Sequence, residues 1–599
     1  MGLAEQLRSA VEDIVEKLVR AGTLPAEVRR TSFSVERPKR PEHGDLATNV
    51  ALVLAKPAKM PPREVASAIA KDLGEVPLVK SVEIAGPGFL NVRFEPAAFQ
   101  NILGEVVAAG PGYGRPASGI GERILVEFVS ANPTGPLLIS HGRGAIVGDA
   151  IARLLEAAGH RVTREYYIND FGNQVRLLAL SAIAATKGEP PPEGGYGGGY
   201  MKELAAWLKE NAKSELEAED VDAIARLCVT RMLDGVPGGT DLRGIKNTLR
   251  DLGIEFDAWY SEESLHRWGR VRAALDKLQE GGFLEEKEGA LFFKSTAVGE
   301  DDKDRVVRRS DGRYTYFASD IAYHADKIAR GYDRLINVLG ADHHGYVPRV
   351  RNAIEALGLP KERFEVVLYQ LVSLLRDGKP YKMGKRLGNL ITIDEVVEEI
   401  DQAAGRKGAG SDALRYFYLI RRSDTPIEFD IEVAKRNSLD NPVFYLQYGH
   451  ARLCAILRRA KDVFGLEVPR YSEALAKRLV HPDELEILAK LGAFPATLQE
   501  AAEERAPHRV LFYLQDLAQA FQSYYTRLKN EKDPILPLAS EMTEGWEARW
   551  DREKSEARLL WVEAIRTVYA AGLQLLGISA PERMERPAQG EVDEGEETK

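Results

Sequence analysis

The chain has 599 residues, a formal net charge of −10, 44% hydrophobic residues and 29% charged residues. This length exceeds a single hydrophobic core and predicts about three to five domains. Because no apolar run approaches the ~18 residues of a membrane span and no signal-peptide pattern is present, we expect a cytoplasmic protein without a membrane partner. Cys228 and Cys454 are too few for a disulfide framework or a thiolate metal site. The negative charge argues against bulk attraction to nucleic acid but leaves room for a local basic face.

The first part of the chain carries the pattern of a parallel sheet. Residues 1–112 alternate helical and strand-like stretches and end in a turn-rich run at 110–114, which is typical of a linker. An apolar strand at 124–129, a glycine-bearing loop, a helix over about 143–158 and a strand at 162–168 follow. This order is a βαβ unit, and it predicts an α/β fold with a parallel sheet.

The rest of the chain predicts an insertion and a helical region. A Pro/Gly-dense stretch at 188–200 opens a largely helical insertion that reaches to about 300. Strand signals return at 335–339 and 366–369, and from 436 the pattern is helical. The tail after Met584 is polar and acidic, which predicts disorder.

The loop between the strand at 124–129 and the next helix is a candidate phosphate site. A loop that leaves a parallel strand and enters a helix places free backbone N–H groups and the positive helix end where a phosphate can bind. Gly142 and Gly144 allow close backbone approach. A tight turn of any doubly wound fold is the alternative, and spacing alone does not decide between the two.

Two carboxylates lie in apolar settings. Glu127 interrupts the strand at 124–129, and Asp320 follows the aromatic run at 314–317. A buried carboxylate needs a cationic partner, from the protein or from a ligand. Two carboxylates and a tyrosine in one pocket would suit a guanidinium, whose planar fork donates paired hydrogen bonds. A structural ion pair with an internal arginine is the alternative.

Two further loops carry groups that could contact a nucleotide. His343 and His344 directly follow the strand expected at 335–339, and ligands of open parallel sheets bind beyond such strand ends. Adjacent histidines on a loop point apart, so we expect no metal there; a surface pair is the alternative. Lys382 and Lys385 flank Gly384 in a cationic loop that could close on phosphates. An ordinary solvated loop is the alternative.

A helix near 441–461 presents an aromatic and basic face. Tyr445, Tyr448, Arg452 and Arg459 recur at helical spacing, on a face separate from the leucines of the same helix. Such a face could stack unpaired bases. Packing of the tyrosines against a neighbouring helix is the alternative.

At this point the residues resemble the arginyl-tRNA synthetase family, of class I. The matching segments occur in order over essentially the whole chain to Met584, and they are 127–136, 165–174, 314–324, 340–348, 441–448 and 575–584. The resemblance implies a class I Rossmann-type catalytic domain with a helical insertion, an N-terminal α+β domain that contacts the tRNA elbow and a C-terminal all-α anticodon-binding domain. The implied boundaries are 1–112, 113–435 with an insertion at about 188–300 and a KMSK-loop and stem-contact region at about 376–435, 436–585, and a tail at 586–599.

The resemblance also implies a reaction and its participants. ATP, accompanied by Mg²⁺, activates arginine to arginyl-adenylate, and the arginyl group then passes to the 3′ end of tRNA(Arg). By matched position, arginine contacts are expected from Glu127, Asn132, Tyr316 and Asp320. ATP contacts are expected from His141, Gly142, His343, His344, Lys382 and Lys385, of which His141 and the two lysines are also the expected catalytic residues. Contacts with tRNA are expected from Phe89, Asn91, Tyr445, Tyr448, Arg452 and Met584. No zinc is expected, and the family implies a monomer.

The ATP motifs depart from the family pattern. The HIGH tetrad reads Leu138-Ile139-Ser140-His141, so its first histidine and its glycine are replaced, and the KMSK loop has Gly384 in place of serine. Leucine cannot donate to a phosphate oxygen, and loss of one such donor typically costs ~2.7–4 kcal/mol. The sequence therefore predicts an arginine–tRNA ligase slowed at the activation step. The alternative is a non-catalytic tRNA-binding derivative of the enzyme.

Overall fold

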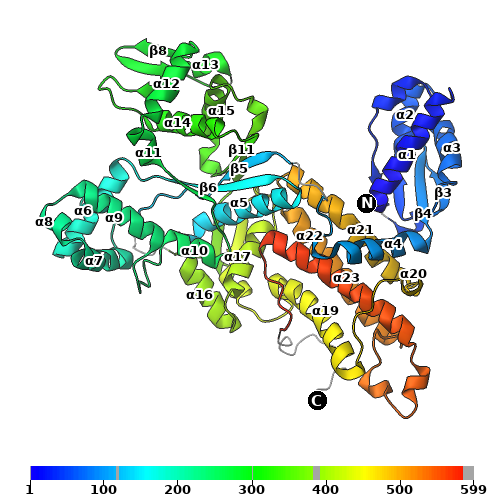
Figure 1. Ribbon diagram of the computed structural model, residues 1–599. Coiled ribbons are helices and arrows are strands. Elements are labelled where there is room, and N and C mark those ends of the chain that lie inside the picture. Colours follow the sequence, from blue (N-terminus) through cyan, green and yellow to red (C-terminus); the bar gives the residue numbers. More distant parts are fainter. Residues whose placement is uncertain (1, 39, 117–120, 300, 382–390, 585–599) are drawn as a thin grey trace.

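A five-stranded parallel sheet lies at the centre of the molecule (Figure 1). The computed structural model describes residues 2–38, 40–116, 121–299, 301–381 and 391–584. From edge to edge the sheet consists of β12 (Phe364–Tyr369), β11 (Arg334–Gly340), β5 (Arg123–Glu127), β6 (Arg161–Ile168) and β7 (Ala258–Ser261). Each neighbouring pair is parallel, so the five carboxyl ends share one edge. The expected parallel α/β sheet is confirmed.

The strand β5 and the helix α5 (Ile139–Ala157) form the most buried part of this domain. Residues 124–126 of β5 are fully buried, which explains their unbroken apolar sequence. The helix packs so closely that a Cβ at Gly148 would lie 2.3 Å from the Phe128 side chain. The strand ends two residues earlier than expected, because Val129 turns the backbone to a φ of 67°.

Two lobes follow β6 along the chain. In Figure 1 the first lobe lies at the left and the second lies at the top. The first lobe is helical and contains α6 (Asn173–Lys187), α7 (Gly199–Asn211), α9 (Val221–Asp234) and α10 (Ile245–Asp251). The chain then returns to the sheet as β7, inside the range 188–300 expected to be a helical insertion. The second lobe contains α11 (Glu262–Arg267), α12 (Arg270–Glu280), α14 (Tyr316–Ala329), α15 (Val347–Ala356) and the antiparallel sheet β10-β9-β8, with β8 (Leu284–Lys287), β9 (Ala290–Phe293) and β10 (Arg305–Arg308).

The N-terminal domain is an α+β unit, as expected, and stands at the right of Figure 1. Its antiparallel sheet has the order β1 (Val35–Glu36), β2 (Leu46–Thr48), β4 (Phe89–Phe94) and β3 (Val79–Ala85). The helices α1 (Leu3–Arg20), α2 (Val50–Ala58) and α3 (Pro62–Leu73) cover it. The next helix, α4 (Pro96–Ala109), packs against the C-terminal helix α21 (Pro482–Glu503) and so joins the two ends of the chain.

The C-terminal region is a helical bundle, as expected. Besides α21 it contains α19 (Pro442–Phe464), α22 (His508–Asn530) and α23 (Arg552–Leu576). By length and composition α23 is apolar enough to cross a membrane, and 67% of its most apolar window is buried inside the protein. Its contacts with α19 and α22 account for this apolar sequence as that of a core helix.

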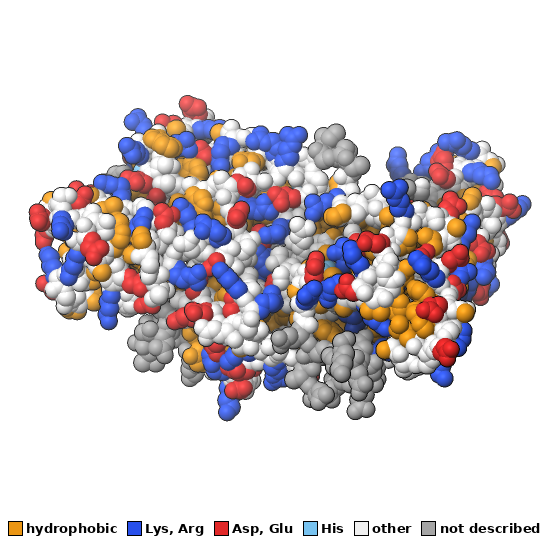
Figure 2. Space-filling view, turned by 60° about the horizontal axis from the view of Figure 1, so that its bottom comes forward, with side chains coloured by type: hydrophobic (Ala, Val, Ile, Leu, Met, Phe, Trp, Pro, Cys, Tyr) orange, Lys and Arg blue, Asp and Glu red, His pale blue; other side chains and the backbone are white. Residues whose placement is uncertain are grey.

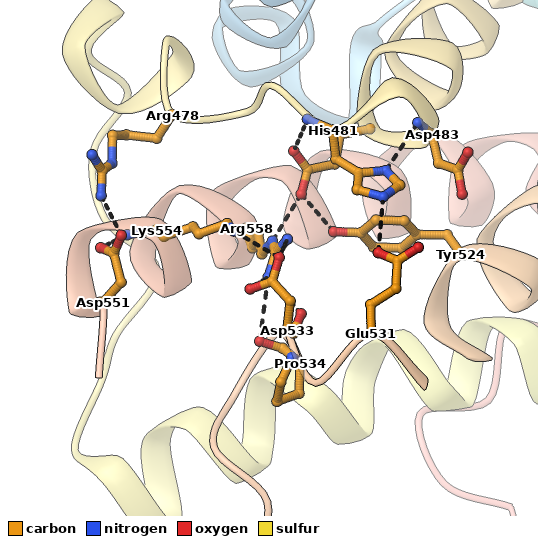
Figure 3. Close-up of polar contacts among 11 residues, drawn as sticks. Arg478, His481, Asp483, Tyr524, Glu531, Asp533, Pro534, Asp551, Lys554 and Arg558 are labelled. Carbon is orange, nitrogen blue, oxygen red and sulfur yellow. Dashed lines mark hydrogen bonds and ion pairs between the residues drawn. The ribbon is translucent and has the colours of Figure 1, made fainter. Parts of the chain in front are cut away.

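A buried ionic cluster fixes three elements of the bundle (Figure 3). The Glu484 carboxylate of α21 is fully buried and accepts hydrogen bonds from Tyr524 of α22 at 2.6 Å and from Arg558 of α23 at 2.8 Å. The Arg558 guanidinium also donates to Asp533, in the segment after α22, at 2.8 Å. Because every member has a partner of opposite charge or a donor, the desolvation of these groups is compensated.

A second buried cation joins three parts of the chain. Arg415 lies on α17 (Ala409–Leu419), and its guanidinium is fully buried. It pairs with Asp149 of α5 at 2.7 Å and donates to the backbone carbonyls of Leu252, after α10, at 2.9 Å and Leu576, the last residue of α23, at 3.0 Å. The helix α5, the first lobe and the C-terminal bundle are therefore all bonded to the Arg415 side chain.

Candidate active site

The carboxyl end of β5 carries a strained turn. Val129 and Ser130 have φ values of 67° and 41°, a region that non-glycine residues rarely adopt and that is especially costly for a β-branched side chain. The Ser130 hydroxyl accepts the Tyr167 N–H at 3.2 Å and donates to Glu127 at 3.1 Å. The backbone of the β5–α5 loop is thus held by the neighbouring strand, which positions the half-exposed segment around Asn132.

Glu127 has a cationic partner from the protein. Its carboxylate lies 2.6 Å from Lys327 Nζ, and both side chains are buried. Lys327 comes from α14 and also donates to Asn337 of β11 at 3.2 Å. The sequence left the partner open between the protein and a ligand and named an internal arginine as the structural alternative; the structure supplies a lysine. One charge of the expected arginine pocket is therefore already neutralised.

Asp320 and Tyr316 share one face of α14, one turn apart, at the carboxyl edge of the sheet. Tyr316 is 68% exposed. Burial, with the nearby charges of Glu262 and Glu127, raises the pKa of Asp320 well above its usual range. Asp320 thus lies near enough to Glu127 for that charge to act on it.

Sequence reasoning missed Glu262, the first residue of α11. Its carboxyl group is buried and contacts the hydroxyl groups of Ser319 and Tyr167. Burial, with the neighbouring charge of Asp170, raises its pKa to about 7. Among the residues that the structure describes, no Lys, Arg or His nitrogen lies within 4.0 Å of Glu262 or Asp320. Two acidic groups without a paired cation therefore face the same edge of the sheet.

The polar groups behind this edge are neutral or paired. His324 Nδ1 donates to the backbone carbonyl of Asp320 in the same helix at 2.8 Å, and its Nε2 lies 3.4 Å from Asn337 Nδ2. Burial and the Lys327 charge lower the pKa of His324 to about 3, so the ring is uncharged at neutral pH. Glu165 of β6 is buried against Arg330 and accepts the Tyr323 hydroxyl at 2.7 Å. Glu262 and Asp320 therefore differ from these groups, because each is an acidic side chain with a raised pKa and no paired cation among the described residues.

The altered HIGH tetrad forms the start of α5. Leu138 is the extended residue before the helix, and its N–H donates to His141 Nδ1 at 3.0 Å. In the neutral ring the proton therefore lies on Nε2. Gly142 is buried, and a Cβ there would lie 3.0 Å from the Tyr418 ring. The N–H groups of Leu138, Ile139 and His141 have partners within the protein, and the positive end of α5 is the feature here that suits a phosphate.

The stem of the KMSK loop is hydrogen-bonded to the HIGH segment. Ile139 N donates to Ile391 O at 3.1 Å, and Ile393 N donates to Leu137 O at 3.0 Å. Lys382, Gly384 and Lys385, for which the sequence predicts phosphate contacts and an altered motif, lie outside the described residues. The described end of their loop is nevertheless fixed beside the start of α5.

The opposite flank of β5 carries the third predicted nucleotide element. His343 and His344 lie in the short helical turn η4 (Ala341–Tyr346) directly after β11, and both are exposed. Asp342, 78% exposed at its side chain, lies 3.8 Å from His343. Because β11 and β5 are neighbours, these groups and the start of α5 stand at adjacent strand ends.

The predicted anticodon face is partly packed inside the bundle. Tyr445 and Tyr448 are half-buried and, with Arg452, line a pocket between α19, α22 and α23. The Arg452 guanidinium lies between the rings of Tyr448 and Tyr525, 5.0 and 5.3 Å from their centres. Phe444 also stacks on Tyr448, with ring centres 5.9 Å apart, so the side chains of this face pack against one another. Met584, half-buried, ends the described chain near α19, where Arg458 donates to the preceding Glu582 carbonyl at 2.8 Å.

The predicted elbow residues line a hollow on the N-terminal sheet. Phe89 is 41% exposed and Asn91 is buried, and both face the same side of β4. The rest of the lining comes from Ser34, Glu36, Arg37, Pro38, His43, Ala47, Asn49, Ala85 and Gly86. On the face of the molecule seen in Figure 2, basic and acidic side chains are interleaved, so the net negative charge does not form a uniform acidic surface.

Comparison with known proteins assigns the same three regions. Residues 105–409 match the family described as tRNA synthetases class I (R), catalytic domain, residues 3–94 match the arginyl tRNA synthetase N terminal domain, and residues 446–584 match the DALR anticodon binding domain. The fold is therefore that of a class I tRNA synthetase.

Individual relatives narrow the class to one family. The chain is 44% identical over 590 residues to an arginine–tRNA ligase of Citrifermentans bemidjiense, covering 97% of this chain and all of the relative. It is 44% identical over 560 residues to an arginine–tRNA ligase of Nitratidesulfovibrio vulgaris, covering 92% and 95%. The Thermus thermophilus arginyl-tRNA synthetase structure shares the fold at a TM-score of 0.71, 24% identity, and 97% and 100% coverage. The chain belongs to the arginyl-tRNA synthetase family.

Proposed function

We propose that the protein is an arginine–tRNA ligase that works at the edge formed by β11, β5, β6 and β7. The observation that carries this proposal is the pair Glu262 and Asp320, two buried or half-buried acidic groups without a paired cation beside Tyr316. A guanidinium between them would relieve their mutual repulsion and donate paired hydrogen bonds to the two carboxylates. Family membership supplies the reaction, and Glu127 and Asn132 complete the proposed arginine contacts.

The first step joins arginine to ATP. An arginine carboxylate oxygen attacks the α-phosphorus, the bond to the β-phosphate oxygen breaks, and arginyl-adenylate and pyrophosphate form. The positive end of α5, with Gly142 and His141 Nε2, stabilises the phosphate charge, and His343 and His344 contact the nucleotide from the β11 side. Lys382 and Lys385 close over the phosphates. Mg²⁺ bound with ATP would add positive charge on the phosphates, and the exposed Asp342 carboxylate would be a ligand for it.

The second step transfers the arginyl group. A ribose hydroxyl of the tRNA 3′ end attacks the carbonyl carbon of the adenylate, AMP leaves with the bonding electron pair, and the hydroxyl proton is released. Phe89 and Asn91 would contact the tRNA elbow, and Tyr445, Tyr448, Arg452 and Met584 the anticodon loop. We further propose a cytoplasmic monomer that binds arginine, ATP and tRNA(Arg), with domains at the boundaries given by the sequence.

The test is charging of total tRNA with labelled arginine in the presence of ATP and Mg²⁺, with labelled lysine and glutamate as controls. Arginine-specific charging is the expected result. Charging of another amino acid would refute the assignment of the pocket. Binding of tRNA without any charging would instead support the non-catalytic alternative raised by Leu138 and Ser140.

A further inference from the structure

An exposed tryptophan lies on the second lobe, close to the proposed arginine pocket. Trp268 follows the last residue of α11, and its side chain is 62% exposed. Such an exposed indole is unusual for a residue of this size, which gains most from burial. Trp268 comes six positions after Glu262, which corresponds to a backbone rise of about 9 Å along the helix axis.

The tryptophan is backed by an anchored arginine. The Arg270 guanidinium lies 4.8 Å from the centre of the indole ring. Arg270 is itself held by the Tyr260 hydroxyl at 2.9 Å and by an ion pair with Asp326 of α14. One part of the ring surface is thus covered by a fixed cation, which prevents the side chain from folding away. The indole presents a preorganised flat surface to solvent.

The surroundings of Trp268 are basic and aromatic. Arg267 and Arg272 are exposed, and within the described parts of the chain no carboxylate lies within 4.0 Å of Arg267. Closer to the pocket, the His266 ring is stacked on Phe171, with ring centres 4.0 Å apart, and Phe171 is 43% exposed. Aromatic rings with neighbouring arginines are the groups that bind single-stranded nucleic acid.

The sheet order decides which reactant this surface meets. The proposed nucleotide contacts lie at β5 and β11, on one side of the arginine pocket. Trp268 follows β7, at the opposite edge, and Figure 1 places α11 between the sheet and the second lobe. Arginine and ATP are already accounted for, so the remaining reactant on this side is the tRNA, whose unpaired 3′ end must reach the pocket from outside.

We propose that Trp268, supported by Arg270, stacks on an unpaired base of the tRNA 3′ end and guides that end towards the pocket. This proposal rests on the proposed function for the identity of the nucleic acid. Arg267 and Arg272 contact the phosphates of the same single-stranded segment. The surface acts by stacking, which every base can provide, so it selects for single-stranded structure and not for sequence.

The test is a thermodynamic cycle of tRNA binding. The dissociation constants of the whole protein and of Trp268→Ala are measured with an arginine-accepting tRNA transcript and with the same transcript lacking its unpaired 3′ end. We expect Trp268→Ala to weaken binding of the complete tRNA by about 5- to 100-fold and to leave binding of the trimmed tRNA unchanged. Trp268→Phe, which keeps an aromatic ring, retains most of the affinity.

A matched control is Trp207→Ala, because Trp207 also carries an arginine, Arg231, 4.9 Å from its ring centre, but lies on α7 of the first lobe. It should bind both tRNAs like the unaltered protein. Equal affinity of Trp268→Ala and the unaltered protein, or equal loss for both tRNAs, would overturn the proposal. Because the readout is binding, a protein that fails to charge arginine refutes the proposed function alone.

Discussion

The backbone N–H of Ile139 donates to the carbonyl oxygen of Ile391 at 3.1 Å, so the first residue of α5 is tied to the residue that follows segment 382–390. The segment 138–141 is thereby joined through main-chain atoms to the residue at which the described chain resumes.

Loss of this hydrogen bond should slow activation. Proline is accepted at the first residue of a helix, and Ile139→Pro removes the N–H that contacts Ile391 together with the buried isoleucine side chain. One lost hydrogen bond of ~1 kcal/mol corresponds to a fall of about fivefold in the kcat of arginine-dependent ATP–pyrophosphate exchange. Ile139→Val keeps the N–H and is the control. An equal loss in both variants would show that side-chain packing, and not the hydrogen bond, is responsible.

Restoring the missing donor should raise the activation rate. Leu138→His places an imidazole at the residue before α5, where it can donate to a phosphate oxygen. We expect kcat for pyrophosphate exchange to rise at least tenfold, because such a donor typically contributes ~2.7–4 kcal/mol and a tenfold rise requires only about 1.4 kcal/mol. The KM for arginine should be unchanged. Ser140→Gly tests adenine access separately. An unchanged rate in Leu138→His would mean that another group already supplies the donor.

Arginine affinity should depend on pH through Glu262. Its pKa, raised to about 7 by burial and by Asp170, leaves it largely protonated below that pH. A guanidinium favours the ionised form, so arginine binding should release protons near pH 7, and affinity should rise as the pH rises from 6 to 8. Calorimetry in buffers of different ionisation enthalpy measures the released protons.

The control for this prediction is the next residue along α11. Glu262→Gln should remove the proton release and weaken arginine binding, whereas Glu263→Gln should preserve both. Asp320 also has a raised pKa, so residual proton release in Glu262→Gln would assign part of the effect to Asp320. Full proton release in Glu262→Gln would contradict the assignment to Glu262.

The cluster in Figure 3 predicts a large stability effect. Arg558→Met leaves the Glu484 carboxylate buried without its cation, which should lower the free energy of unfolding by about 3–5 kcal/mol. Lys554→Met removes a more exposed partner of the same Asp533, at 2.6 Å, and should cost less than ~1 kcal/mol. Urea unfolding followed by helical circular dichroism compares them. Similar losses in the two variants would contradict the special role of the buried pair.

Elements with strong periodicity could be predicted from the sequence, and weakly marked ones could not. The strand at 162–168 and the helix near 441–461 correspond to β6 and α19 because long apolar patterns define them. β7 was missed because its four residues are only half-buried and lie between helices. Glu262 was missed because Ser261, Glu262 and Glu263 form the pattern of an ordinary helix start, with a serine cap and acidic residues in the first turn.

Contacts between side chains that are distant in the sequence could not be predicted either. Glu127 was predicted to need a cation because a charge in an apolar strand is costly, but Lys327 lies 200 residues away, and only the packing of α14 against the sheet brings it to 2.6 Å. The site residues His141 and Asp320 could be named by resemblance, whereas the His141 ring tautomer depends on a backbone contact that only the structure shows.

The position of Arg415 has a consequence for synthesis of the chain. Its guanidinium needs the carbonyl of Leu576, and a Cβ at the following Gly577 would lie 2.3 Å from it. Ribosomes deliver Asp149 and Leu252 hundreds of residues before Leu576, so the catalytic region emerges with an incompletely bonded internal cation. Its interior is completed only when nearly all of the 599 residues have left the ribosome. A polypeptide interrupted late in translation therefore lacks the final contact of its catalytic helix, which couples assembly of the active site to completion of the chain.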